Sequence, residues 1–277
     1  MELEKKEDHR ASFTLSPSSL NVYYQSPLLF YLTYIAKVPD DTPVPVCYGL
    51  SGNLVHDCLE KYANKEFDKD GACLYLLEKW ESMDMNNKYD VKGNPLDQVE
   101  YLTAMLKGIE VIDEHENHLC EEIISFPFKE NEIMKIGIKG IIDLQATKKD
   151  DSEFVIIDYK TSNSISEGEN FERQALFYNL LLHKKKNIIP SKTSFHYLKL
   201  GASRNYVFDL DDIEEFKLEL DNVADQILSF GTNIEKYPVG EIDNIFNSKK
   251  QACMQEIERR KRIENPDYLN ELNAQFF

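Results

Sequence analysis

Two apolar runs of strand length, each carrying one carboxylate, constrain this chain more than any other feature. The first run surrounds Asp143, and the second, residues 154–157, leads directly into Asp158. A charged side chain is expensive to bury at the end of a β-branched run unless it is paired or bound to a metal. The connection at residues 148–152 is short and polar, which favours a hairpin. The hairpin would place both carboxylates on neighbouring strands.

Lys160 follows Asp158 by two residues, and side chains at this spacing share one face of a strand. Two carboxylates and a lysine on one face suit metal-assisted cleavage of a phosphodiester, because carboxylate oxygens bind Mg²⁺ or Mn²⁺. The ion would lower the pKa of a water and stabilise charge on the phosphoryl oxygens. Lys160 would orient the attacking water or stabilise the phosphorane. A surface Asp-Lys pair is the simpler alternative, but Asp143 upstream favours the site.

Three motifs follow one another in this region: Gly140-x-x-Asp143, Asp158-Tyr159-Lys160-Thr161 and Gln174-x-x-x-Tyr178. Together they resemble the PD-(D/E)xK nuclease superfamily, and specifically its RecB-type branch, which includes the AddB nuclease domain and CRISPR adaptation exonucleases. Gln174 and Tyr178 share one face of a helix because they are four residues apart. The resemblance implies that they position Lys160 and the DNA strand. Ordinary helix surface and core is the alternative for this pair.

A further motif, Gly52-x-x-x-His56, resembles the RecB-family helix that supplies a histidine to the metal. An imidazole binds a divalent ion through one nitrogen while the other is held by a second group. The resemblance therefore implies a metal site of His56, Asp143, Asp158 and the backbone carbonyl of Tyr159. A core or surface histidine is the alternative for His56. Related enzymes often carry a glutamate on a preceding strand, and Glu121 or Glu122 would add an acidic group behind these metal ligands.

The iron–sulfur members of this branch have a cysteine directly before the proline that is Pro27 here. In this chain the position is Ser26, and of the five scattered cysteines only Cys253 lies near the C-terminus. A [4Fe–4S] cluster needs four thiolates. We therefore expect no cluster and an iron-free protein. The cysteines, odd in number and without a Cys-x-x-Cys motif, suit free thiols in a reducing compartment.

The expected fold class is α/β, with a restriction-endonuclease-like core in which helices flank a mixed central β-sheet. With 277 residues, of which 42% are hydrophobic, the chain is large enough for one such domain. We expect a single nuclease domain over residues 1–277, with a disordered leader at 1–12. A helical cap insertion is expected at 71–118, and a C-terminal helix and tail at 247–277.

Capping and periodicity predict several elements around this core. Ser16 and Pro17 mark a helix start, and Pro27 predicts a restart. Residues 121–128 and 132–137 are predicted as separate strands that lead into the hairpin. Further predicted elements are strands at 193–200 and 204–208 and helices at 211–230 and 247–262.

The net charge of −17 argues against a protein that coats DNA, whose affinity depends on many Lys and Arg contacts. Two basic stretches, residues 183–186 and 259–262, are candidate DNA patches, although each is more simply a solvated helix face. Weak, salt-sensitive binding follows, or action beside a helicase or another DNA-processing protein. No apolar run is long enough to span a membrane, and the N-terminus lacks an apolar signal core. We expect an intracellular protein, cytoplasmic or nucleoid-associated.

The predicted activity is a metal-dependent deoxyribonuclease, an exonuclease that acts at ends or on single strands. The expected catalytic residues are Lys160, Asp143, Asp158, Gln174 and Tyr178, with Mg²⁺ or Mn²⁺ as cofactor. Two alternatives stay open at this point: a catalytically inactive DNA-binding or scaffold module with the same fold, and an RNA-processing nuclease. The pathway is also open among repair, virus replication and CRISPR adaptation.

Overall fold

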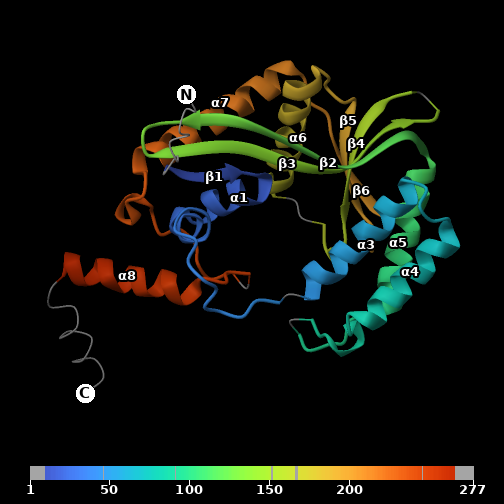
Figure 1. The fold of residues 1–277 in the computed structure, drawn as a ribbon, viewed down its shortest axis with the longest axis horizontal. Coiled ribbons are helices and arrows are strands. Elements are labelled where there is room, and N and C mark those ends of the chain that lie inside the picture. The colour runs from blue at the N-terminus through green and yellow to red at the C-terminus, as the bar shows by residue number, and fades with distance from the viewer. Residues whose placement is uncertain are drawn as a thin grey trace, which may run out of the picture. The chain divides into compact units, whose positions relative to one another are not determined.

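The computed structural model describes residues 10–45, 47–90, 92–150, 152–165, 168–244 and 246–265 (Figure 1). Its strands are β1 (Ala11–Leu15), β2 (His115–Glu130), β3 (Met134–Lys148), β4 (Phe154–Lys160), β5 (Lys192–Tyr197) and β6 (Ala202–Tyr206). Its α-helices are α1 (Pro17–Gln25), α2 (Pro27–Phe30), α3 (Cys47–Ala63), α4 (Lys69–Ser82), α5 (Gln98–Asp113), α6 (Glu169–Lys186), α7 (Leu210–Phe230) and α8 (Lys250–Glu264). Short π- and 3₁₀-helical turns occur at Tyr31–Ile35, Met85–Asn87 and Ile234–Lys236.

The central sheet is mixed, which confirms the predicted fold class. Its strand order is β1-β3-β4-β5-β6, and β2 also pairs with β3. The β3–β4 and β5–β6 pairs are antiparallel, whereas β4 and β5 are parallel. Parallel neighbours need a crossover connection, and α6 provides it between β4 and β5. The predicted hairpin is therefore β3–β4, and the Gln-x-x-x-Tyr helix is the crossover.

The chain forms two compact units. One comprises Met1–Val44, Pro127–Gly137 and Val223–Phe277, and we call it the terminal unit. The other comprises Pro45–Phe126 and Ile138–Asn222, and it contains every residue predicted for the site, so we call it the site unit. Within the described residues, no helix is both long enough and apolar enough to cross a membrane.

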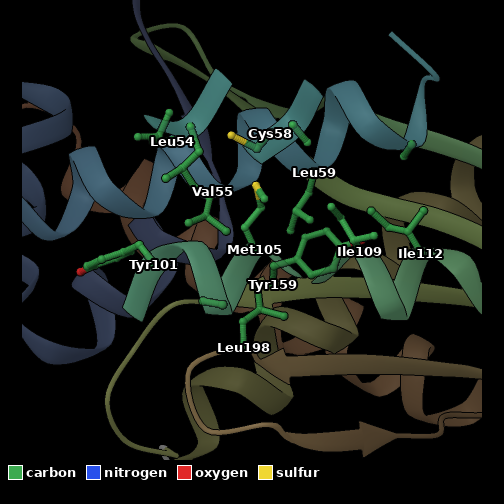
Figure 2. Packing of buried hydrophobic residues seen from close by; sticks show 14 of the residues in the cluster. Leu54, Val55, Cys58, Leu59, Tyr101, Met105, Ile109, Ile112, Tyr159 and Leu198 are labelled. Carbon is green, nitrogen blue, oxygen red and sulfur yellow. The ribbon is translucent and has the colours of Figure 1, made fainter. Parts of the chain in front are cut away.

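The core of the site unit lies between α3, α5 and one face of the sheet (Figure 2). Apolar residues on α3 and α5 interdigitate, and Tyr159 and Leu198 come to them from the sheet side. Trp80 of α4 is fully buried in the same cluster. The stretch predicted as a helical insertion thus contributes α4 and α5 to the main core. Whether it also acts as a cap stays a prediction.

The helical stretch ends earlier than predicted. Residues 71–118 were expected to be helical, but α5 ends at Asp113 and β2 begins at His115. The His115 Nδ1 lies 2.7 Å from the Val111 carbonyl oxygen, one of the last carbonyls of α5 that lack a partner within the helix. This local contact ends the helix, and apolar periodicity does not reveal it.

One predicted strand and the predicted leader also need correction. Residues 132–137 were expected to form a strand separate from the one around Asp143, but residues 134–137 and Asp143 belong to the continuous strand β3, which begins at Met134. Burial alternates through Gly137 and Gly140 without a break, so neither glycine ends the strand. The predicted leader at 1–12 is wrong at its end, because Ala11–Leu15 is β1 and the Ala11 N–H donates to the Ile133 carbonyl. Residues 1–9 lie outside the described part of the chain, as do residues 266–277 of the predicted tail.

The terminal unit confirms the predicted helix start at Ser16 and the predicted restart at Pro27. Ser16 caps α1 with Pro17 in the first turn, and Ser26 restarts the chain as the cap of α2. The buried Ser26 hydroxyl accepts from the Leu29 N–H and donates to the Val239 carbonyl. The expected absence of an iron–sulfur cluster stays a prediction.

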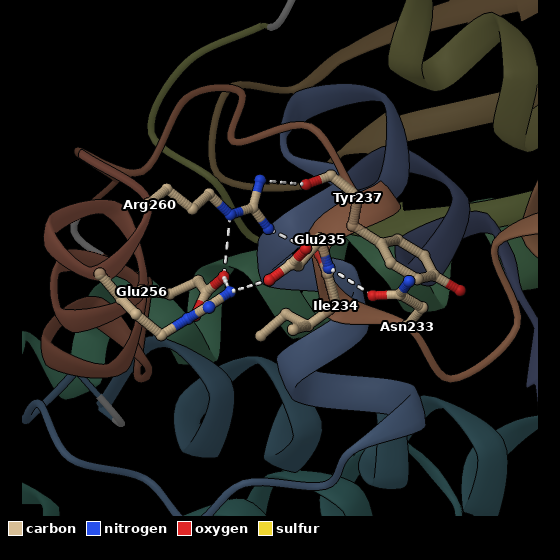
Figure 3. A network of polar contacts seen from close by, with 7 residues as sticks. Asn233, Ile234, Glu235, Tyr237, Glu256 and Arg260 are labelled. Atoms are coloured by element: carbon tan, nitrogen blue, oxygen red, sulfur yellow. Dashed lines mark hydrogen bonds and ion pairs between the residues drawn. The ribbon is translucent and has the colours of Figure 1, made fainter. Parts of the chain in front are cut away.

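The candidate DNA patch at 259–262 includes two arginines that act within the protein (Figure 3). Arg260 donates to the carbonyl oxygens of Ile234 and Tyr237 and to the Glu256 carboxylate. Arg259 donates to both oxygens of Glu256, whose side chain is only 8% exposed. The hydrogen bonds from Arg259 and then Arg260 lower the pKa of Glu256, although burial opposes them. These contacts join α8 to the 3₁₀ turn at Ile234–Lys236.

Candidate active site

The β3–β4 register brings the two predicted carboxylates together. Leu144 pairs with Ile157 at the end of the antiparallel ladder, and Asp143 and Asp158 are the next residues on the two strands. Both side chains are largely withdrawn from water, with Asp143 12% and Asp158 3% exposed. Because two buried carboxylates repel one another, each needs partners of its own.

Asp143 is held by β4 and α3. Its Oδ2 accepts from the Tyr159 N–H at 2.8 Å and lies 3.4 Å from Nδ1 of His56. The other ring nitrogen of His56, Nε2, lies 2.9 Å from the carbonyl oxygen of Tyr159. The imidazole therefore spans the carboxylate of one strand and the backbone carbonyl of the next.

The charges around this ring shift several pKa values. Burial alone would lower the pKa of His56, but the Asp143 carboxylate, helped by Asp158 and Glu121, raises it to about 9. Burial would raise the pKa of Asp143, yet the charge and hydrogen bond of His56 lower it overall. Asp143 is thus the stable anion of the pair. Burial raises the pKa of Asp158, because Lys160 only partly offsets the cost.

Asp158 is surrounded by the lysine and the crossover helix. The Lys160 ammonium lies 2.5 Å from Oδ1, which confirms that the two side chains share a face of β4. Gln174 Nε2 donates to Oδ2 at 2.9 Å, and the Tyr178 hydroxyl donates to the same oxygen at 3.1 Å. The Gln174 amide also contacts the Tyr178 hydroxyl at 2.6 Å and accepts from Lys160 at 3.3 Å. One helix face therefore fixes both Asp158 and Lys160.

One group of side chains in the site could hold a metal ion: His56, Glu121 and Asp143. Each offers one ligand atom, and these atoms lie within 4.8 Å of one another. An imidazole and two carboxylates suit a divalent cation such as Mg²⁺ or Mn²⁺. Burial and the charge of Asp143 raise the pKa of Glu121 to about 7, so a cation would relieve the repulsion in the cluster. Asp158 lies outside this group.

Sequence reasoning left the choice between Glu121 and Glu122 open. The backbone of Glu121 has φ of 48°, a left-handed conformation that is uncommon for a residue other than glycine. Strand alternation alone therefore does not predict where its side chain lies. The Glu122 carboxylate instead pairs with Lys185 and Lys186, both at 2.9 Å. Two lysines of the other candidate DNA patch, residues 183–186, are thus engaged by the protein itself.

Close packing explains the glycines of two motifs. A Cβ on Gly52 would lie 3.0 Å from the Thr161 hydroxyl oxygen, directly after Lys160. A Cβ on Gly140 would lie 2.6 Å from Leu181 of α6 and within 3.5 Å of the Tyr178 ring. Both glycines therefore allow a helix to approach the strands that carry the site.

Comparison with protein families gives a match over residues 14–242 to the model of the PD-(D/E)XK nuclease superfamily. This chain belongs to that superfamily. The match covers β3, β4 and α6, so the nuclease motifs fall inside it. The superfamily hydrolyses phosphodiesters and typically uses divalent metals, in agreement with the donor set around His56.

Comparison with curated proteins finds no match. Among solved structures, this nuclease is similar to a chain named "Putative exonuclease" from Eubacterium rectale, with 10% identity, a TM-score of 0.46, and coverage of 87% of this chain and 90% of that one. It is also similar to SSO0001, with 16% identity, a TM-score of 0.31, and coverage of 64% and 86%. At these scores the likenesses are weak, and the assignment depends on the family model.

Proposed function

We propose that this nuclease is a metal-dependent deoxyribonuclease of the RecB type, an exonuclease that acts at DNA ends or on single strands. The observation that carries the proposal is the complete set of His56, Asp143, Asp158 and Lys160 in one partly buried constellation. A scaffold that had lost catalysis would not need to keep buried carboxylates beside a lysine, since such groups are costly without a task.

His56, Glu121 and Asp143 are the proposed ligands of Mg²⁺ or Mn²⁺, and Asp158 and the Tyr159 carbonyl complete the site. When bound, the ion supplies an activated water and stabilises charge on the phosphoryl oxygens. His56 must give up its proton to bind, and the Tyr159 carbonyl holds its ring in place.

Lys160 is the proposed catalytic cation. Its ammonium stands beside Asp158, where it orients the attacking water or stabilises the phosphorane. Gln174 and Tyr178 are positioning residues, because their contacts go to Asp158 and Lys160. Locked side chains matter here, since small displacements at a reacting centre cost large factors in rate.

The net charge of −17 limits how tightly the chain can bind DNA by itself. The arginines of α8 and the lysines of α6 are largely paired with carboxylates, as described above. We therefore propose weak, salt-sensitive binding, with a helicase or another DNA-processing protein delivering the strand. The stretch 71–118 is the proposed cap beside which that strand passes.

The decisive experiment is digestion of end-labelled single-stranded DNA, double-stranded DNA and RNA with Mg²⁺, Mn²⁺ or EDTA. Cleavage of DNA is expected with either metal, loss with EDTA, and no cleavage by Asp143→Ala or Asp158→Ala. Glu122→Ala, which removes a carboxylate outside the metal group, is the matched control and should stay active. Near-parental cleavage by either aspartate variant would refute the site. Faster cleavage of RNA would favour the RNA-processing alternative.

A second assay tests whether the nuclease needs a DNA end. Linear DNA should be degraded faster than covalently closed, relaxed circles of the same sequence. Equal rates on the two substrates would contradict the exonuclease proposal without affecting the metal site.

The purified protein should also be colourless and free of iron, and stoichiometric iron with visible absorbance would contradict the absence of a cluster.

A further inference from the structure

A row of aromatic side chains extends from the site toward the edge strand of the sheet. The Phe171 and Phe195 ring centres are 5.4 Å apart, and Phe195 and Tyr206 are 5.7 Å apart. Tyr206 and Phe208 follow at 6.1 Å with an interplanar angle of 12°, so they are stacked. We call these four residues the aromatic row. They come from α6, β5, β6 and the segment that follows β6, all within the site unit.

Strand pairing makes this row continuous with the catalytic residues. Asp158 pairs with Phe195, and Phe195 pairs with Arg204. Because directly paired residues project from the same face of a sheet, the three side chains lie on one face. The Lys160 ammonium lies 5.2 Å from the Phe171 ring centre and 5.1 Å from that of Phe195. The row therefore begins at the proposed catalytic cation.

The outer rings are less buried than a core would require. Phe195 is fully buried, whereas Phe171, Tyr206 and Phe208 are only partly buried and pack against it from outside. The Tyr206 hydroxyl makes no hydrogen bond within the described residues. A ring that serves only as packing gains little from a buried hydroxyl without a hydrogen-bond partner. The outer rings thus have faces or edges to offer a ligand.

A cation stands at each end of the aromatic row, which favours an anionic strand as the ligand. The Arg204 guanidinium stands 5.5 Å from the Tyr206 ring centre, and Lys160 stands at the opposite end. Glu172 is the opposing charge near Tyr206, and it is exposed to solvent, where its repulsion is screened. Rings flanked by cations match a strand of single-stranded nucleic acid, whose bases stack on aromatic faces while its phosphates meet the cations.

We propose that the aromatic row binds unstacked bases of single-stranded DNA next to the scissile phosphate. This inference rests on the proposed function, because it assigns the substrate of the same site. The row would hold the strand by stacking, which is independent of sequence, and so supplement the weak electrostatic binding of an acidic protein. Duplex DNA, whose bases are already stacked within the helix, would not use it.

The test compares DNA strands with and without bases. Binding of a fluorescent oligo-dT and of an abasic oligonucleotide of equal length is measured by anisotropy in EDTA, so that no cleavage occurs. Tyr206→Ala and Phe208→Ala should each weaken oligo-dT binding by about fivefold to a hundredfold. Neither should change binding of the abasic strand, because its phosphates are intact. Tyr206→Phe keeps the ring and should bind as the parent does.

Two controls guard against a folding effect. Val207→Ala truncates an exposed neighbour that lies outside the row, and it should leave both affinities unchanged. Tyr206→Leu keeps apolar bulk without an aromatic face, so it should fold and still lose oligo-dT binding. Equal affinities of all variants for oligo-dT, or equal losses on the abasic strand, would overturn the inference. So would failure of the parent to prefer oligo-dT over the abasic strand.

The outcomes separate this inference from the proposed function. Cleavage of the abasic oligonucleotide with Mn²⁺ reports the metal site without any base to stack, and the Tyr206 variants should retain the parental rate. If the protein cleaves DNA while the row variants keep the parental KM for oligo-dT, the row is only packing and the nuclease proposal stands. If oligo-dT binds through the row but nothing is hydrolysed, the row stands and the nuclease proposal fails.

Discussion

Glu121→Gln is expected to have opposite effects on the metal-free and the metal-bound protein. In the metal-free protein, burial and the nearby Asp143 charge raise the pKa of Glu121 to about 7 from its ordinary 4.5. A carboxyl whose pKa is raised by folding stabilises the fold fully below its unfolded pKa, and this stability is lost as the pH rises toward 7. At pH 8 the ionised side chain therefore destabilises the metal-free fold.

The pKa difference sets the size of the effect. Each pKa unit corresponds to 1.36 kcal/mol, so at pH 8 the ionised Glu121 costs up to about 3 kcal/mol. This is an upper bound, since water still reaches part of the side chain. The neutral glutamine removes that cost and should raise the unfolding free energy without metal. Loss of an outer-shell partner already weakens metal binding by about 10–100-fold, so losing a direct ligand should cost at least as much.

Glu122→Gln is the matched control, because it removes one negative charge at the adjacent position. The Glu122 carboxylate pairs with Lys185 and Lys186, so its loss should lower stability and leave metal affinity nearly unchanged. The assay is denaturant unfolding at pH 8 and pH 4 without metal, together with calorimetric titration of Mn²⁺ into each variant. The reasoning is refuted if Glu121→Gln binds Mn²⁺ like the parent, or if it is less stable than the parent without metal at pH 8.

Three further outcomes are expected. Lys160→Ala should lose about a hundredfold to a thousandfold in turnover yet bind Mn²⁺ within a few fold of the parent by calorimetry, and parental cleavage would remove its catalytic role. Gly52→Ala should lower DNA cleavage, because its Cβ would press on the Thr161 hydroxyl directly after β4. Gly49→Ala, whose Cβ would have no neighbour within 4 Å, should instead raise the unfolding free energy by up to about 1 kcal/mol in denaturant titrations. Folding lowers the pKa of Glu256, so its carboxylate stabilises the fold above its ordinary pKa of 4.5 and stabilises it less as the pH falls below that value. Glu256→Gln should therefore lower the unfolding free energy by about 1–3 kcal/mol at pH 7 and by less at pH 3. An equal loss at both pH values would contradict this assignment.

Residue types and their local spacing were sufficient to predict the strands and the hairpin that carry the site. The polar turn and the two apolar runs predict the β3–β4 hairpin, and the spacing of Asp158 and Lys160 places them on one face of β4. The cap at Ser16 was also predictable, because a side chain that accepts from a backbone N–H two or three residues later acts within one turn. The restart at Pro27 was predictable because proline cannot donate a helical hydrogen bond. Such features depend on neighbours in the chain.

The features that the sequence did not determine depend on contacts and backbone conformations that apolar periodicity and strand alternation do not encode. The end of α5 follows from one imidazole contact to a backbone carbonyl, and the continuity of β3 follows from burial on both sides of its glycines. The choice of Glu121 over Glu122 follows from a left-handed backbone that breaks the strand alternation.

The sequence by itself determined which residues are chemically able to form a nuclease site, because carboxylates, imidazole and ammonium at these spacings have few other uses together. The tertiary structure decided how their charges are balanced. It assigned Asp143 to His56, and Asp158 to Lys160, Gln174 and Tyr178. It also paired the candidate basic patches with carboxylates and aligned the aromatic row with Lys160. The physical reason is that electrostatic and stacking energies depend on distance and burial, which only the folded chain sets.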